Sequence, residues 1–198
     1  MASRPYHHGA LEIALTDAAM EVVRASGIGA LTLRDLARTV QVSPSAVYRH
    51  FPSRDHLVSR VSQLARQALA RDLLTRRDAV TTRGRPARRT VERFEEIGRT
   101  YVQFAIDNPH MFEAAFVRCD IRPVNPDDPD AWGVLVDAID QMIDAGAVPE
   151  TRRQDGPIIS WAGVHGLAQI VTASTWPDGV SADAHIDAVI SGITRSLR

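Results

Sequence analysis

The side chains best suited to chemistry lie in residues 33–51, where apolar spacing and turn residues predict two short helices joined by a tight turn. On the second helix the polar side chains gather on one side, and they are Ser45, Tyr48, Arg49 and His50. Such groups can hydrogen-bond to phosphates and to base edges, and a single helix fits the major groove of DNA. The pattern therefore predicts a helix-turn-helix site that reads nucleic acid.

Capping residues mark where both helices begin. Thr32 is predicted to cap the first helix, with Asp35 three residues later completing a capping box. Ser43 is predicted to cap the second, and Pro44 suits its first position because that position lacks a hydrogen bond in any case. The apolar residues of both helices then face inward: Leu33, Leu36, Ala37, Val40, Ala46, Val47 and Phe51.

A preceding amphipathic helix is predicted over residues 10–26, ending at Gly27. It completes a three-helix DNA-binding domain over residues 1–53. Residues 1–8 include arginine, tyrosine and two histidines without apolar periodicity, which predicts a flexible arm. Such an arm can follow DNA, although a loose chain end without a role explains the segment equally well.

The helix after this domain is predicted to start with Ser53 as its cap and to run to about residue 74. Arg54 lies in its first turn, where the helix dipole disfavours a positive charge. We therefore expect Arg54 to face a DNA phosphate. Residues 75–90 contain an arginine run with a glycine and a proline, which predicts a solvated connection.

The remainder, residues 54–198, is predicted to form one helical domain. Helical spacing recurs over 91–107, 110–116, 131–145, 157–176 and 184–197, and the proline-rich and aspartate-rich segment 120–130 is predicted to be a loop. The strict alternation typical of strands is missing from the sequence. The fold is therefore predicted to be all-α, with about nine helices.

Composition and charge fit this organisation. The 198 residues are 44% hydrophobic, enough for a buried core. Residues 1–100 hold 17 arginines against 10 acidic residues, a net charge of +7, whereas residues 101–198 carry 6 against 14, a net charge of −8. The positive half favours a polyanion partner.

The sequence contains neither a membrane-spanning apolar run nor a secretion signal, so we expect a cytoplasmic protein. In such a protein we expect the lone Cys119 to be an ordinary buried thiol.

The last two predicted helices also bear on assembly. The segment 157–176 is apolar on most of its sides, and 184–197 carries one apolar stripe. Such helices need a partner surface, and copies of themselves would supply it, so we predict a homodimer. Its symmetry would present two DNA-reading helices to two half-sites of an approximately palindromic target.

These features resemble the tetracycline-repressor (TetR) family of bacterial transcription regulators. The likeness covers residues 8–57, including LTLRDLARTVQVSPSAVYRHFPSRDHL, and rests on Thr32, Ala37, Val42, Ser43, Tyr48, His50, Phe51 and Arg54. Residues 161–167, WAGVHGL, are similar to the signature of a WHG-type subgroup. The resemblance implies a repressor that binds a palindromic operator as a homodimer, with a cavity framed by helices from about residue 54 to 176 and release from DNA when an inducer binds.

Roles of single residues follow from the resemblance by position. Contacts with phosphates are implied for Thr32, Tyr48, His50 and Arg54. A position facing base edges or the groove is implied for Ser45, Ala46 and Arg49, and Ser43 is also predicted to bind DNA. We expect Arg49 to read guanine, because its planar fork can meet two acceptors on one base. Gln41 departs from the family, which usually has glycine in this turn, and the turn is expected to need a positive φ.

For the ligand, apolar and aromatic residues of the C-terminal helices are the candidates: Phe104, Met111, Phe112, Phe116, Met142, Trp161 and His165. Each of them fits the hydrophobic core as well. His165, between Gly163 and Gly166, also fits a close helix crossing in the dimer. Neither a cofactor nor a metal is predicted, because the seven histidines are scattered.

Two other classes of protein compete with this interpretation. An enzyme is disfavoured, because the sequence has no nucleophile with a paired base and no phosphate-binding glycine loop. A helical protein-interaction module with a degenerate DNA-binding head stays open, since Gln41 and the near-neutral total charge both allow it. Salt titration separates this module from a DNA-binding protein, because phosphate contacts weaken steeply as salt rises.

Overall fold

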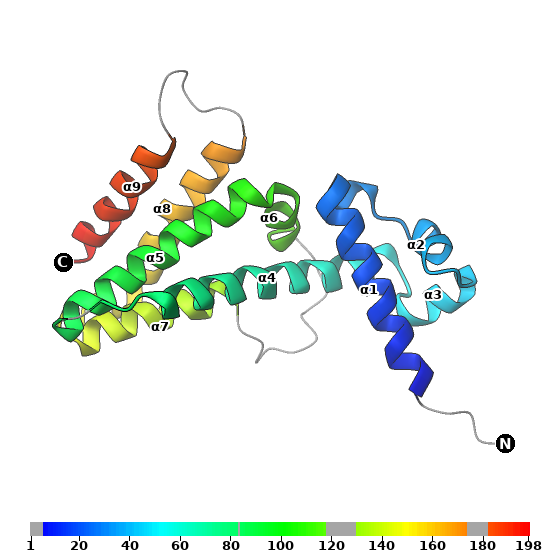
Figure 1. The fold of residues 1–198 in the computed structure, drawn as a ribbon, viewed down its shortest axis with the longest axis horizontal. Coiled ribbons are helices and arrows are strands. Elements are labelled where there is room, and N and C mark those ends of the chain that lie inside the picture. The colour runs from blue at the N-terminus through cyan, green and yellow to red at the C-terminus, as the bar shows by residue number, and fades with distance from the viewer. Residues whose placement is uncertain (1–5, 83, 118–129, 174–181) are drawn as a thin grey trace. The chain divides into compact units, whose positions relative to one another are not determined.

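The computed structural model describes the backbone of residues 6–82, 84–117, 130–173 and 182–198, and the side chains of these ranges except 6–8 and 182–184. Cys119, nearly all of the predicted loop 120–130 and the first five residues of the predicted arm lie outside the described residues. Figure 1 shows the order of the helices along the chain.

Within these ranges the chain forms nine α-helices and one short 3-10 helix, η1, and no strand. The bounds are α1 Tyr6–Ser26, η1 Ile28–Ala30, α2 Leu33–Thr39, α3 Pro44–His50, α4 Arg54–Ala79, α5 Pro86–Asp107, α6 Pro109–Ala115, α7 Ala131–Asp144, α8 Arg152–Thr172 and α9 Ala182–Leu197. The predicted all-α class and the number of helices are confirmed for this part of the chain.

Contacts between residues divide the chain into two compact units. The first unit contains residues 1–66 and 110–127, and the second contains residues 67–109 and 128–198. Helix α4 therefore begins in the first unit and ends in the second, and α6 belongs almost wholly to the first. The domain boundary after residue 53 stays a prediction, because compact units and evolutionary domains are different divisions of a chain.

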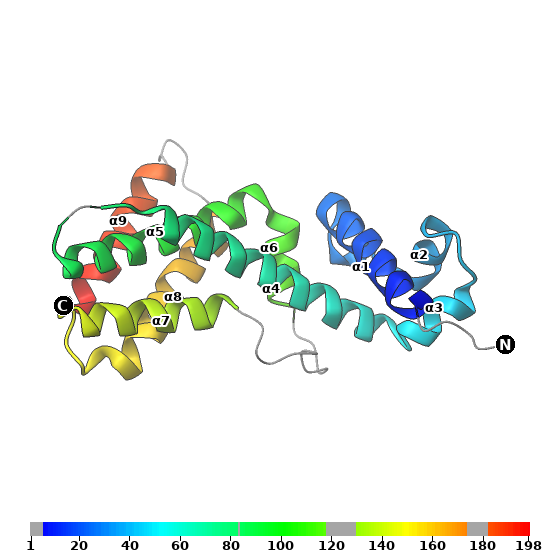
Figure 2. The same ribbon diagram turned by 60° about the horizontal axis from the view of Figure 1, so that its bottom comes forward.

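The first unit is built around α1. Helices α2 and α3 lie beside it in both views (Figures 1 and 2), and η1 fills the space before α2. Leu15, Val23, Leu31, Leu36 and Val47 are fully buried there. The apolar spacing of the three helices thus produces one small core, as the sequence predicts.

In the second unit α5 packs against α7, α8 and α9, and α8 also packs against α9 (Figure 2). The crossing of α8 and α9 is close at Gly163, because a Cβ added there would lie 2.6 Å from Cδ1 of Ile193. This crossing joins two helices of the same chain, and a crossing near His165 in a dimer stays a prediction. A Cβ at Gly166 would meet nothing within 4 Å.

Several helices are longer than the sequence predicts. Helix α1 begins at Tyr6, so residues 6–8 of the predicted arm are helical. Helix α4 continues to Ala79 and α5 already starts at Pro86, so most of the predicted connection 75–90 is helix. Proline suits the first turn of α5, which explains its early start. Helix α8 begins at Arg152 and passes through Pro157, the residue at which apolar spacing predicts its start.

The turn between α2 and α3 has the positive φ expected from the sequence. Gln41 has φ 58°, and it is the sole non-glycine residue of the described ranges with a positive φ. The amide of Val42 donates to the carbonyl of Ala37 at 2.9 Å, and that of Gln41 donates to Arg38 at 3.2 Å. The bond from Val42 to Ala37 belongs to a Schellman motif, which ends a helix with a left-handed residue.

Helix α7 ends in the same way, but with glycine. Gly146 has φ 67°, its amide donates to Ile143, and the amide of Ala147 donates to Met142, both at 2.8 Å. A Cβ at Gly146 would meet nothing within 4 Å, so a side chain there would be opposed by backbone strain alone. The chain thus contains a matched pair of turns.

We predict opposite effects when these two residues are exchanged. Gln41→Gly should raise the free energy of unfolding by about 0.5–1 kcal/mol because it removes left-handed strain, and Gly146→Gln should lower it by a similar amount. Chemical denaturation of both variants checks this. Shifts of the same sign in the two variants would contradict the assignment of strain to Gln41.

Candidate nucleic-acid interface and internal cavity

Helix α3 is held at its N-terminus by the predicted cap. The hydroxyl of Ser43 accepts a hydrogen bond from the amide of Ala46 at 3.3 Å, and Pro44 is the first helical residue. Val47 is fully buried and Phe51 nearly so, which fixes the inner face of the helix on the core. The outer face is thereby presented to solvent in a defined orientation.

The outer face carries the predicted DNA-binding residues. Ser45 and Arg49 are exposed, Tyr48 is 53% exposed although it is a large aromatic residue, and His50 is half-buried. Ala46 is only 8% exposed, which agrees with its predicted packing role and leaves little of its side chain to face a base. The groove-facing role of Ala46 therefore has the weakest structural support of the set.

Thr32 caps α2 as predicted. Its hydroxyl accepts from the amide of Asp35 at 3.1 Å and donates to the Asp35 carboxylate at 2.6 Å. Thr32 thus already has partners within the protein, and so does Ser43, whose hydroxyl lies 3.0 Å from that of Ser45. Their contacts with phosphates stay predictions.

Arg54 lies at the start of α4, but its guanidinium has partners that the sequence does not reveal. Its Nε donates to the carbonyl of Leu31 at 3.0 Å, and one terminal nitrogen donates to the carbonyl of Ile28 at 2.7 Å. These carbonyls belong to η1 and to the residue that precedes the Thr32 cap. The expected phosphate contact of Arg54 stays a prediction beside this observed structural role.

Helix α6 is attached to the first unit through its C-terminus. Arg66 donates to the carbonyl of Ala115 at 2.9 Å and to the hydroxyl of Ser62 at 2.7 Å, and Ser62 is fully buried. A positive charge at a helix C-terminus is favourable. At the other end of α6, the ring of His110 lies against Gly27, where an added Cβ would be 3.2 Å from Nδ1.

The predicted ligand residues are divided between the two units. Met111, Phe112 and Phe116 belong to the first unit, where the rings of Phe112 and Phe116 are 5.1 Å apart between centroids. In the second unit, Phe104 and Met142 are buried core residues. None of these five lines the cavity described below, and their role in ligand binding stays a prediction.

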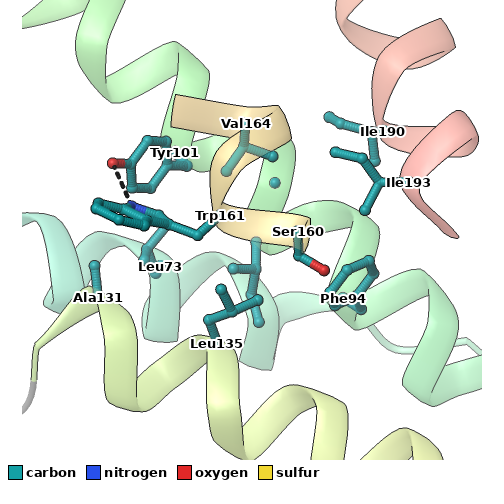
Figure 3. A pocket seen from close by; sticks show the side chains of 12 residues that line it. Leu73, Phe94, Tyr101, Ala131, Leu135, Ser160, Trp161, Val164, Ile190 and Ile193 are labelled. Atoms are coloured by element: carbon teal, nitrogen blue, oxygen red, sulfur yellow. Dashed lines mark hydrogen bonds between the residues drawn. The ribbon is translucent and has the colours of Figure 1, made fainter. Parts of the chain in front are cut away.

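An internal cavity lies in the second unit, between α4, α5, α7, α8 and α9 (Figure 3). Its volume is about 30 Å³. Of the predicted residues only Trp161 lines it, beside eleven others: Leu73, Phe94, Ile97, Gly98, Tyr101, Ala131, Leu135, Ser160, Val164, Ile190 and Ile193. Sequence periodicity does not reveal where a gap is left between five helices.

A small polar cluster borders this cavity. The Tyr101 hydroxyl and Nδ1 of His165 share a hydrogen bond of 2.8 Å, and Nε1 of Trp161 donates to the Tyr101 hydroxyl at 3.4 Å. Burial raises the pKa of the Tyr101 hydroxyl and lowers that of the His165 imidazole, so both are neutral near pH 7. His165 therefore contributes to the site through Tyr101 and not by lining the cavity.

The described residues contain no group of three or more histidine, cysteine, aspartate or glutamate side chains arranged to hold a metal ion. Of the helices searched, none is long and apolar enough to cross a membrane.

Both halves of the chain match family models. Residues 15–61 match that of bacterial regulatory proteins of the tetR family, and residues 94–193 match that of the tetracyclin repressor-like C-terminal domain. No curated protein matches the chain.

Solved structures share the fold over nearly the whole chain. A protein of unknown function from Rhodococcus sp. RHA1 has 22% identity and a TM-score of 0.77, and the match covers 98% of this chain and 99% of that one. A TetR variant from Acinetobacter baumannii AYE, in complex with minocycline, has 20% identity, coverage of 93% and 96%, and a TM-score of 0.61. The regulator PfmR from Thermus thermophilus has 18% identity, coverage of 93% and 98%, and a TM-score of 0.52.

Proposed function

Because this chain belongs to the tetR family of bacterial regulatory proteins and is a DNA-binding transcriptional regulator, we propose that it is a repressor that binds a palindromic operator as a homodimer and is released by a small-molecule inducer. Regulators of this family are not enzymes, and the chain is therefore not one. A cytoplasmic location and the WHG-type subgroup, the latter supported by residues 161–167 of α8, belong to the same proposal.

The outer face of α3 is the observation that best supports the proposed binding to an operator. A capped helix presents Ser45, Tyr48 and Arg49 to solvent together, and Tyr48 is 53% exposed. This set suits contact with DNA, since phosphates, sugars and base edges offer partners to all three side chains. Thr32, Ser43 and His50 are proposed as further contacts around this face.

The turn geometry bears on the alternative of a degenerate head. Gln41 adopts the positive φ of a Schellman motif, and the amide of Val42 closes that motif on the carbonyl of Ala37. The turn between α2 and α3 is thus formed without glycine. The protein-interaction alternative loses the argument that rested on Gln41.

An exposed apolar face of α8 supports the homodimer. Ile158 is 49% exposed, Ile159 and Ala162 are exposed, and the space beside Gly166 is open. These residues recur at three- and four-residue steps, so they share one side of the helix. A contiguous apolar strip of this kind on a regulatory protein favours an interface. The open space at Gly166 would allow a second helix to approach closely.

We predict that Arg49→Ala removes discrimination at one base pair of each half-site. The loss should be about 1–3 kcal/mol for the operator and little for scrambled DNA, because a base contact carries sequence information and a phosphate contact does not. Fluorescence anisotropy with an operator selected from random DNA measures both affinities. Arg24→Ala, which removes an exposed arginine of α1, serves as the control. Equal losses on operator and scrambled DNA would contradict the role of Arg49.

For the dimer, we predict that Ile158→Asp yields a monomer at micromolar concentration, because two carboxylates would be buried in an apolar interface. Ile13→Asp, at an isoleucine of α1 that is 62% exposed, should leave the mass unchanged. Size-exclusion chromatography with light scattering measures both. A dimer that tolerates Ile158→Asp, or an unmodified chain that is monomeric, would exclude this interface.

A further inference from the structure

The walls of the internal cavity limit the chemistry of its ligand. Its twelve lining residues include no aspartate, glutamate, arginine or histidine, and their polar side-chain groups are those of Tyr101, Ser160 and Trp161. The Ser160 hydroxyl is already used, since it donates to the carbonyl of Gly156 at 2.7 Å. A charged ligand would lose its hydration and gain no opposite charge from this lining, so the site favours an uncharged one.

The aromatic lining favours a single ring, which fits only if the cavity widens. Phe94, Tyr101 and Trp161 supply aromatic surfaces, and aromatic pairs are favoured beyond the area they bury. The cavity of about 30 Å³ holds little more than a water molecule or two, whereas a benzene-sized ligand occupies a cavity of roughly 150 Å³. A single ring thus already requires the walls to widen, and larger molecules would require extensive unpacking of the helices.

The hydrogen-bonding group lies at one side of the cavity. In Figure 3 Tyr101 and Trp161 lie together, joined by their hydrogen bond, and Ile190 and Ile193 of α9 lie across from them. The Tyr101 hydroxyl is held by His165 on α8, so its position is fixed relative to both helices. A ligand hydroxyl placed beside the Tyr101 hydroxyl would form hydrogen bonds with uncharged side chains only.

We propose that this cavity binds a small uncharged molecule with one aromatic ring and one hydroxyl group, its ring packing on Phe94 and Trp161 and its hydroxyl beside Tyr101. Binding widens the space between α5, α8 and α9. That this molecule is the inducer rests on the proposed function, whereas its binding to the cavity does not.

Isosteric probes test the charge requirement on the unmodified full chain. Benzyl alcohol, benzoate and benzylamine have nearly the same shape but are neutral, anionic and cationic. Isothermal titration without DNA at pH 7 should show benzyl alcohol binding at least about 10-fold more tightly than either ion. Equal affinities, or no binding of benzyl alcohol up to about 10 mM, would overturn the proposal.

Substitution tests the position of the hydroxyl. Tyr101→Phe should weaken benzyl alcohol roughly 5- to 10-fold and leave toluene unaffected, because it removes one hydroxyl and keeps the ring. Met142→Leu, at a fully buried core residue outside the lining, should change neither affinity. Equal weakening of both probes by Tyr101→Phe would contradict the assigned orientation. Operator binding is measured separately, so a chain that binds DNA but not benzyl alcohol refutes this inference alone.

A second and independent inference concerns Arg54. Its guanidinium spans the carbonyls of Ile28 and Leu31, and Leu31 is fully buried and directly precedes the Thr32 cap of α2. Two nitrogens of the planar Arg54 guanidinium therefore connect the start of α4 to the residues that directly precede α2. We infer that Arg54 is a positioning residue, which sets the orientation of α2 and α3 through these carbonyls.

Lysine and alanine at this position separate positioning from phosphate contact. Lysine keeps the charge but cannot supply the planar pair of donors. If Arg54 positions α2 and α3, Arg54→Lys and Arg54→Ala should both weaken operator binding roughly 5- to 10-fold. The slope of log K against log salt should then stay that of the unmodified chain. If Arg54 only contacts a phosphate, Arg54→Ala makes the slope shallower by about 0.9 and Arg54→Lys restores it.

Affinities are compared at a temperature where circular dichroism shows every variant to be folded, so a loss of stability alone would leave them unchanged. Arg24→Ala is the control for removing an arginine of the same unit, and it should alter neither affinity nor slope. Full affinity in Arg54→Lys would overturn the positioning role.

Discussion

The orientation of α3 depends on how the chain reverses between α2 and α3. Helix α2 must stop, and the hydrogen bonds of the Schellman motif at Gln41 stop it at the cost of a left-handed residue. Ser43 then starts α3 within two residues. With Val47 buried against the core, this turn decides where Arg49 and Tyr48 point, and the DNA-binding function depends on that direction.

Close packing of helices shapes the interior of the second unit. At Gly163, α9 approaches α8 so closely that an added Cβ would force Ile193 to shift, and at Gly98 of α5 an added Cβ would lie 3.3 Å from Cγ1 of Ile190. Where these helices and α7 fail to fill the space between them, a small cavity remains, with one neutral polar cluster at its side. A site of this kind can respond to an apolar ligand, because any ligand that enters must separate helices that are otherwise in contact.

Local signals in the sequence predicted local structure well. The caps at Thr32 and Ser43 depend on residues two or three positions away, and the positive φ at Gln41 follows from the need to end one helix and begin another. The acceptors of Arg54 lie 23 and 26 residues away, and no local pattern reveals them. Arg54 lies in a first turn where the helix dipole disfavours its charge, and two backbone carbonyls of the same protein accept hydrogen bonds from it, while its phosphate contact stays a prediction.

The ligand site was predicted least well, for a physical reason. Aromatic and methionine residues at helical spacing fill cores far more often than they line cavities, and four of the seven predicted residues, Phe104, Met111, Phe112 and Met142, are buried core residues here. A cavity is a property of how five helices meet, and side-chain type alone does not encode it. Tyr101 carried a weak signal, because a tyrosine in an apolar stripe needs a partner for its hydroxyl.

In the proposed homodimer, two symmetrically placed copies of α3 read DNA. Selection of bound sequences from random double-stranded DNA by the purified full chain is the experiment that tests this arrangement. We expect enrichment of one approximate palindrome whose half-sites are centred about 10–10.5 base pairs apart, or a multiple of that spacing. Recovery of sequences without any common motif would contradict it.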